Sequence, residues 1–251
     1  VSRIDPIVEK LNGVKLMFFV GREVPAYAED CCRLVEFCSS SAPPVALTEE
    51  DDAAIYFSSG TTGFPKAILH KHRSLLGSCM TEQKHHGQTR DDVFLCIPPL
   101  YHTGAKMHWF GSLISASKAV LLRGVKPEWI LRAVTEEKCT IVWLLVPWCQ
   151  DLLEAIESGR IDMGHYLLDQ WRLMHIGAQP VPQSMIHRWL KLFPHHQYDT
   201  NYGLSESIGP GCVHLGVENV DKVGAIGKPG YQWQARIVDE QGNDVPQGEV
   251  G

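Results

Sequence analysis

The chain has 251 residues, of which 44% are hydrophobic and 21% are charged, an ordinary composition for a globular protein. This length can bury a substantial core, in one large domain or two small ones. The formal net charge of −6 and the lack of a basic run argue against general nucleic-acid binding, because a phosphate backbone rewards clustered Lys and Arg.

The eight cysteines show no CxxC pair and no regular spacing, and several lie in apolar stretches. Buried free thiols behave as small hydrophobes, so the sequence favours a reducing, cytoplasmic compartment. The longest apolar run, 141–149, contains Pro147 and is too short to span a bilayer. We therefore expect no transmembrane segment, and the first residues show no signal-peptide pattern.

Strand and helix patterns alternate along the chain. The first pattern is an apolar run at 14–20, expected to be a buried strand, and the second is a helix at 31–38 with apolar residues at i, i+3, i+4 and i+7. A short buried strand is expected at 53–57, and further strands at 67–70, 93–97, 118–123, 140–146, 171–176 and 197–202. Further helices are expected at 73–86, from about 105 to 116, at 127–138, from 147 past 156, and at 182–193. This alternation predicts an α/β fold with mostly parallel sheets flanked by helices.

The pattern changes after Gly209. Residues 234–238 alternate weakly, Gly242-Asn243 predicts a turn, and 245–250 could pair back as a hairpin. We therefore expect two domains, an α/β part at 1–209 and the start of a small β-barrel module at 210–251.

A loop rich in glycine and hydroxyl side chains separates the strands expected at 53–57 and 67–70. It reads Ser58-Ser59-Gly60-Thr61-Thr62-Gly63-Phe64-Pro65-Lys66. Free backbone N–H groups and hydroxyls in such a loop can surround an anion, and Lys66 adds a positive charge. A simple turn is the alternative. The P-loop of NTPases does not fit, because that motif ends in Gly-Lys-Ser/Thr, whereas Lys66 follows Pro65 and precedes Ala67.

A second motif, Tyr202-Gly203-Leu204-Ser205-Glu206, follows the strand expected at 197–202. A carboxylate next to a hydroxyl at a strand end can bind Mg²⁺, which prefers oxygen ligands, although such a pair can also be a helix cap. In their order, the two motifs resemble those of the AMP-forming acyl-adenylating (ANL) superfamily. This superfamily includes acyl-CoA synthetases, peptide-synthetase adenylation domains and firefly luciferase.

Two weaker motifs match the same superfamily. Gly177-Ala178-Gln179-Pro180 resembles its adenine-contacting loop, with a strand-to-helix turn as the alternative. Leu100-Tyr101-His102-Thr103-Gly104 resembles its acyl-pocket segment, in which His102 would border the carboxylate as a gate, with a structural histidine at a helix start as the alternative. The resemblance runs from about Asp51 to Gly251 and is looser upstream.

The resemblance implies an AMP-forming acyl-CoA synthetase that uses ATP and Mg²⁺ to form an acyl-adenylate and then transfers the acyl group to CoA. Lys66, Ser205, Glu206 and His102 would be the catalytic residues, and Glu206 would hold the metal. The nucleotide would contact Ser58, Ser59, Gly60, Thr61, Thr62, Gly63, Phe64, Pro65, Lys66, Gly177, Ala178, Gln179, Pro180, Thr200, Asn201, Tyr202, Gly203, Leu204 and Ser205.

Two alternatives stay open. One is an acyl-adenylating enzyme that delivers to a carrier-protein thiol or uses its acyl group for oxidation, and the other is a non-catalytic nucleotide- or acyl-binding module. The expected partner is a small carboxylic acid and not nucleic acid, with homodimerisation left open. The superfamily's ribose-binding Asp, hinge and C-terminal lysine would lie beyond Gly251, so we expect an N-terminal domain fragment that is incomplete for catalysis.

Gly203 departs from the acetyl-CoA synthetases, which resemble this chain but have a tryptophan that blocks the acid pocket at the matching position. This difference implies a fatty or aryl acid larger than acetate. Trp109, Phe110 and Trp143 are candidates to line the space, with ordinary core packing as the alternative.

Paired histidines at 85–86 and 195–196, and the pair His70 and His72, raise the question of a transition-metal site. None has the supporting Cys, Asp or Glu spacing of a zinc site, and the two adjacent pairs lie in polar stretches near helix ends. The sequence therefore favours surface histidines.

Overall fold

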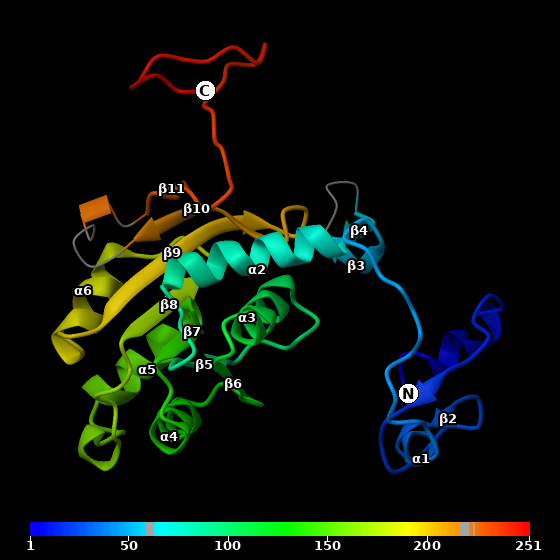
Figure 1. Ribbon diagram of the computed structural model, residues 1–251. Coiled ribbons are helices and arrows are strands. Elements are labelled where there is room, and N and C mark those ends of the chain that lie inside the picture. The colour runs from blue at the N-terminus through cyan, green and yellow to red at the C-terminus, as the bar shows by residue number, and fades with distance from the viewer. Residues whose placement is uncertain (59–62, 216–220, 223) are drawn as a thin grey trace. The chain divides into compact units, whose positions relative to one another are not determined.

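The computed structural model describes residues 1–58, 63–215, 221–222 and 224–251 (Figure 1). The chain forms two compact units, Val1–Leu47 and Thr48–Gly251. Four of the predicted site residues, Ser59, Gly60, Thr61 and Thr62, lie outside the described residues.

The first unit contains a 3₁₀ helix, Asp5–Lys10, two short strands and one helix. Strand β1 (Phe18–Phe19) pairs in parallel with β2 (Glu29–Asp30), and helix α1 (Cys31–Glu36) follows. The Asp30 side chain begins α1 by accepting hydrogen bonds from the backbone N–H groups of Cys32 and Arg33, at 3.0 and 3.2 Å.

The prediction of a buried strand at 14–20 is wrong. Only Phe18–Phe19 is a strand, and no side chain of this fully described unit is buried. An apolar run in the sequence indicates a strand, but the strand is buried only where other elements cover it. Here β1 pairs with the two-residue strand β2.

The second unit is built on a seven-stranded sheet with the order β11-β10-β9-β8-β7-β5-β6. Its strands are β5 (Val93–Cys96), β6 (Lys118–Leu121), β7 (Ile141–Leu145), β8 (Leu173–Gly177), β9 (Gln197–Leu204), β10 (Gly209–Leu215) and β11 (Lys228–Pro229). Five strands that are neighbours in the sheet, in the order β6, β5, β7, β8 and β9, pair in parallel. Strands β10 and β11 pair antiparallel at one edge. The predicted mostly parallel α/β sheet is therefore confirmed.

Helices cover both faces of this sheet (Figure 1). The helices are α2 (His72–His86), α3 (Thr103–Ile114), α4 (Pro127–Glu137), α5 (Val146–Glu157) and α6 (Gln183–Leu192), with a short 3₁₀ turn at Met163–His165. Helices α4, α5 and α6 share one core with Leu95, Leu144 and Met174, and α3 contributes Ala105 to a second core on the other face. Helix α2 ends at Gly87, which has a left-handed backbone conformation with a φ of 55°, as is common for a glycine after a helix.

Strands β3 (Asp52–Ser58) and β4 (Lys66–Lys71) form a separate antiparallel hairpin. The predicted return strand is thus confirmed, but β3 is not a central buried strand. Ile55 and Phe57 are 61% and 68% exposed. Only Tyr56 of β3 is buried, where it contacts the ring of His70 and lies 5.2 Å from the Lys106 ammonium on α3.

The β-barrel module expected at 210–251 stays a prediction. Strands β10 and β11 join the main sheet, and the described residues after β11 contain one isolated bridge, between Val238 and Asp244. The predicted turn at Gly242-Asn243 is present, with the Asp239 carboxylate accepting from the Asn243 N–H at 2.8 Å.

None of the helices in the described part of the chain has the length and apolar character needed to cross a bilayer. The eight cysteines are free, and burial raises the pKa of Cys79, Cys96, Cys139 and Cys149 to about 12. These four thiols therefore stay protonated at neutral pH and act as apolar side chains.

His196 lies in an aromatic cluster between α6 and β9. Its ring stacks on Phe193 at 4.6 Å and contacts Trp171 at 4.8 Å, and its buried Nδ1 has no hydrogen-bond partner among the described residues. Burial, with a smaller effect of His195, lowers the pKa of His196 from 6.5 to about 4.

We expect His196→Phe to make the protein more resistant to acid. The unfolded chain protonates this imidazole below pH 6.5 and the folded chain only near 4, so its contribution to stability is complete above 6.5 and is lost as pH falls toward 4. Between pH 7.5 and 5 the loss should be about 2 kcal/mol. Urea unfolding of both proteins across this range measures it, with exposed His165→Phe as the control. Parallel stability curves for the parent and His196→Phe would contradict the assignment.

Candidate active site

A pocket of about 740 Å³ opens where the parallel strands of the second unit end. Pro98 follows β5, Leu145 ends β7, Ala178 follows β8, and Thr200–Leu204 end β9. Ligands in open α/β sheets bind at this carboxyl edge, and the volume lies within the usual range of small-molecule pockets. The apolar side chains of the lining include Met107, Trp143, Leu145, Trp148, Val181 and Ile226.

Three of the predicted motifs meet in this pocket. His102 and Gly104 line it from the start of α3, Ala178, Gln179 and Pro180 from the loop after β8, and Thr200, Asn201, Tyr202, Gly203, Leu204 and Ser205 from β9 and the turn that follows. Gly177 ends β8 next to them. His102 is exposed and its side chain makes no capping hydrogen bond to α3, so the structure gives it no evident role in starting that helix.

Two residues with an unusual backbone conformation lie next to the pocket. Ala178 and Ile208 have φ values of 67° and 60°, which are unusual for non-glycine residues and especially for a β-branched one. The Ser78 hydroxyl holds the Ile208 carbonyl at 2.7 Å. Such strained positions persist where the surrounding structure fixes them, often at functional sites.

The hairpin β3–β4 connects the glycine-rich loop to the second motif. The hydroxyl of Ser58 donates to the Glu206 carboxylate at 3.3 Å, and Lys66 is registered opposite Ser58. The His70 ring lies at hydrogen-bond distance, 2.9 Å, from the Ser205 carbonyl. The described ends of the loop, Ser58 and Lys66, thus lie on the same side as Glu206. Gly63, with a φ of 84°, precedes Phe64 and Pro65, and Phe64 is 81% exposed.

Gly203 has a structural role in the pairing of β9 and β10. A Cβ at this position would lie 1.8 Å from the Gly209 carbonyl oxygen, because β9 and β10 pair there. Any side chain at 203 would therefore require the two strands to move apart. Sequence comparison alone could not show this requirement.

Of the three aromatic candidates, Trp143 lines the pocket, and its ring would be 2.4 Å from a Cβ placed on Gly104. Trp109 and Phe110 stack on each other at 5.3 Å and are not among the described residues that line the pocket. Both rings are only partly buried and belong to neither core, so the structure places these two residues neither in the pocket wall nor in the core.

The expectation that the paired histidines lie on the surface is wrong for His85, His86, His196 and also His70. Their side chains are buried, whereas His72, His187 and His195 are more accessible. The reason lies in partners that are distant in sequence: strands β8 and β9 cover the end of α2, and the aromatic cluster covers His196.

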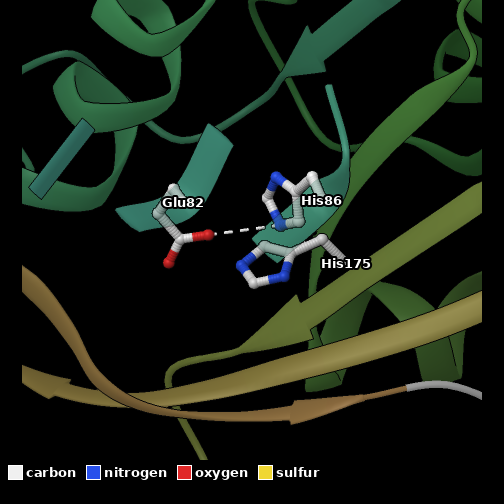
Figure 2. Close-up of side chains that lie close together, drawn as sticks. All are labelled: Glu82, His86 and His175. Atoms are coloured by element: carbon white, nitrogen blue, oxygen red, sulfur yellow. Dashed lines mark ion pairs between the residues drawn. The ribbon is translucent and has the colours of Figure 1, made fainter. Parts of the chain in front are cut away.

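Six of the buried polar side chains form a group that we call the histidine–carboxylate cluster. Its members are Glu82, His85 and His86 from α2, His108 from α3, His175 from β8 and Asp199 from β9. Figure 2 shows three of them converging, with an ion pair between Glu82 and His86. Sequence reasoning missed the cluster, although the Glu82 and His86 spacing of i, i+4 places both on one helix face.

Burial and mutual attraction oppose each other in this cluster. Burial by itself would raise the pKa of Asp199, but His86, His175 and His85 hold it well below its usual value. Burial lowers the pKa of His108 well below its usual value, so this imidazole is neutral. His108 stacks on Phe94 at 4.6 Å and also lines the pocket, which places the cluster directly beside it.

The sequence model of the family described as AMP-binding enzyme matches residues 6–251. The chain belongs to this AMP-binding enzyme family. A curated relative, 4-coumarate–CoA ligase-like 9 of Arabidopsis thaliana, is 31% identical over 219 residues, which are 85% of this chain and 38% of the relative. The 2-succinylbenzoate–CoA ligase of Bacillus anthracis is 25% identical over 92% of this chain and 47% of its own length.

Solved structures of the acyl-adenylating superfamily share the fold of this chain. The long-chain-fatty-acid-CoA ligase FadD1 of Archaeoglobus fulgidus has a TM-score of 0.84 at 22% identity, covering 98% of this chain and 49% of its own. The o-succinylbenzoate CoA synthetase of Bacillus subtilis, solved with ATP and magnesium ion, has a TM-score of 0.71 at 20% identity, covering 86% and 44%. The chain thus spans less than half the length of these relatives.

Proposed function

We propose that this chain provides the ATP- and acid-binding part of an AMP-forming acyl-CoA ligase. The observation that supports this most is the convergence of His102, the loop Ala178–Pro180 and Tyr202–Ser205 at one pocket, with the glycine-rich hairpin attached beside it through Ser58 and Glu206. The relatives named as CoA ligases support the same reaction class.

A carboxylate reacts poorly with nucleophiles because its negative charge repels them. Joining the acid to AMP makes one of its oxygens part of a good leaving group. The protein must therefore hold two anions together and stabilise the charge that develops on the α-phosphate and the departing pyrophosphate. Positioning can supply about 7–11 kcal/mol of such a barrier, and one preorganised donor about 3–4 kcal/mol.

In this proposal Lys66 and the loop amides bind the triphosphate, Tyr202 packs against the adenine, and Ser205 donates to a phosphate oxygen. Glu206 fits the binding of Mg²⁺, since its exposed carboxylate lies beside the Ser58 hydroxyl and both are oxygen ligands. When bound, Mg²⁺ would neutralise phosphate charge. His102 borders the acid, and CoA is the second substrate, with a carrier-protein thiol as the alternative acceptor.

The apolar part of the pocket, around Met107, Trp143, Trp148 and Val181, indicates a fatty or aryl acid larger than acetate. The decisive experiment is acid-dependent exchange of pyrophosphate into ATP by the complete gene product, with acids from acetate to medium-chain and aryl acids. We expect exchange with the larger acids and acyl-CoA only when CoA is added. Folded protein that supports no exchange with any acid would refute the ligase, and acyl-adenylate that ignores CoA would favour a carrier thiol.

Trp143→Ala should shift acid preference toward longer or bulkier chains. The Trp143 ring occupies the pocket wall facing Gly104, so its removal lengthens the space. Because one methylene in such a pocket changes kcat/KM by roughly 10- to 200-fold, we expect the ratio for two acids that differ by two carbons to change by at least about tenfold. The control is Trp129→Ala, because Trp129 lies on helix α4 and is not among the described residues that line the pocket. An unchanged ratio in Trp143→Ala would place the acid elsewhere.

A further inference from the structure

The histidine–carboxylate cluster contains an unusual number of buried polar atoms without hydrogen bonds. Both ring nitrogens of His85 and of His86, Oε2 of Glu82 and Oδ2 of Asp199 are buried and make no well-aligned hydrogen bond among the described residues, although ion pairs of 3.1–3.2 Å link the imidazole Nε2 atoms to these carboxylates. Native proteins leave few such atoms, and each needs an explanation, such as a bound ion. Here they occur together.

The distances between these atoms match the spacing of ligands around a metal. Nε2 of His86 lies 3.2 Å from Oε2 of Glu82 and 3.2 Å from Oδ2 of Asp199. Two ligands at about 2.0–2.1 Å from Zn²⁺ and at a tetrahedral angle are about 3.3 Å apart. Glu82, His86 and His175 each offer a ligand atom, and these three atoms lie within 4.8 Å of one another.

Asp199 fixes the orientation of His175. Its Oδ1 lies 2.6 Å from His175 Nδ1, so this nitrogen carries the hydrogen and the other nitrogen, Nε2, keeps its lone pair. Figure 2 shows a ring nitrogen of His175 directed toward the Glu82 carboxylate. A histidine that binds a metal through one ring nitrogen usually donates a hydrogen bond from the other nitrogen, often to a carboxylate.

The charges point to a divalent cation. Glu82 and Asp199 are two buried carboxylates, and their ion-pair partners among the described residues are imidazoles only. The nearby cation Arg172 is already paired with Asp92, at 2.9 Å. Buried charges need compensation, and a single ion of charge +2 balances both carboxylates.

We propose that Glu82, His86 and His175 bind a divalent first-row transition metal, zinc by preference, inside the second unit. Imidazole and carboxylate ligands suit zinc, and three protein ligands leave one position for water or for a neighbouring side chain. The ion joins α2 to β8 and, through Asp199, to β9. It therefore steadies the two strands that lead into the loop 177–180 and the motif 202–206, whether or not the chain is a ligase.

The test is the metal content of the complete gene product, prepared without an affinity tag and without chelators, after dialysis against Zn²⁺. Inductively coupled plasma mass spectrometry should find about one zinc ion per chain that dialysis does not remove. Glu82→Gln and His86→Gln should each lower this occupancy at least about tenfold. His187→Gln, which changes an exposed histidine on α6, should keep full occupancy.

Two further measurements keep the proposal falsifiable if the variants do not fold. X-ray absorption at the zinc edge of the parent protein should show nitrogen and oxygen ligands with imidazole scattering, and Co²⁺ should give the visible bands of a four-coordinate site. Sulfur ligands would assign the ion to the free cysteines and overturn the proposal. Folded parent protein that retains neither Zn²⁺ nor Co²⁺ would also overturn it, and would leave the cluster as ion pairs among its own side chains.

Discussion

Replacing Lys66 by Met is expected to slow acid-dependent exchange of pyrophosphate into ATP by about 10²-fold or more, the usual loss when one preorganised donor is removed. Lys66 begins β4, opposite Ser58, whose hydroxyl contacts Glu206. A cation at this position faces the place where the triphosphate charge develops in the proposed reaction. Methionine keeps the aliphatic length of the side chain and removes only the charge and its hydrogen bonds.

Lys71→Met is the matched control, because Lys71 lies on the same strand and forms an exposed ion pair with Glu50 at 2.8 Å. Exposed pairs of this kind contribute little to stability, so exchange should be unchanged. The two variants should have the same circular dichroism spectrum as the parent. Near-normal exchange in Lys66→Met would remove this residue from the triphosphate site.

Glu206→Gln is expected to have a similarly large effect, at least about 10²-fold on exchange, together with a requirement for more Mg²⁺. Glutamine keeps the size of the side chain and can still accept from the Ser58 hydroxyl, 3.3 Å away. It lacks the negative charge that a hard divalent cation prefers. The loss should therefore come from metal binding and not from a displaced loop.

Exchange measured across a series of Mg²⁺ concentrations separates the two causes. If Glu206 binds the ion, added Mg²⁺ should recover part of the lost rate in Glu206→Gln. Glu137→Gln, at an exposed pair with Lys118, serves as the control. An unchanged Mg²⁺ dependence and rate in Glu206→Gln would assign the metal to other ligands.

Local sequence predicts much of the central sheet, because its strands are short apolar runs with clear boundaries in the sequence. Strand β7, with four of its five residues buried, and the helix end at Gly87 are cases in which local chemistry and tertiary structure agree. The run at 53–57 looks the same in the sequence but belongs to a two-stranded hairpin. No local pattern states how many layers will cover a strand.

In the candidate site, too, local sequence predicts some features and the tertiary fold determines others. The motifs at 58–66, 177–180 and 202–206 are contiguous in sequence, so their order and resemblance predict them, and the pocket brings the last two together with His102. The histidine–carboxylate cluster is not contiguous. His175 and Asp199 reach Glu82 and His86 only because β8 and β9 are neighbours under α2, which requires the topology.

The attachment of the β3–β4 hairpin also affects the order in which the protein is assembled. Its two bonds to the second motif, from Ser58 to Glu206 and between His70 and Ser205, join residues 148 and 135 positions apart. At a synthesis rate of about 5–20 residues per second, the hairpin waits roughly 7–27 s before its anchor emerges from the ribosome. A newly made chain therefore carries its glycine-rich loop early, and the contacts between this hairpin and the second motif form only near the end of translation of this region.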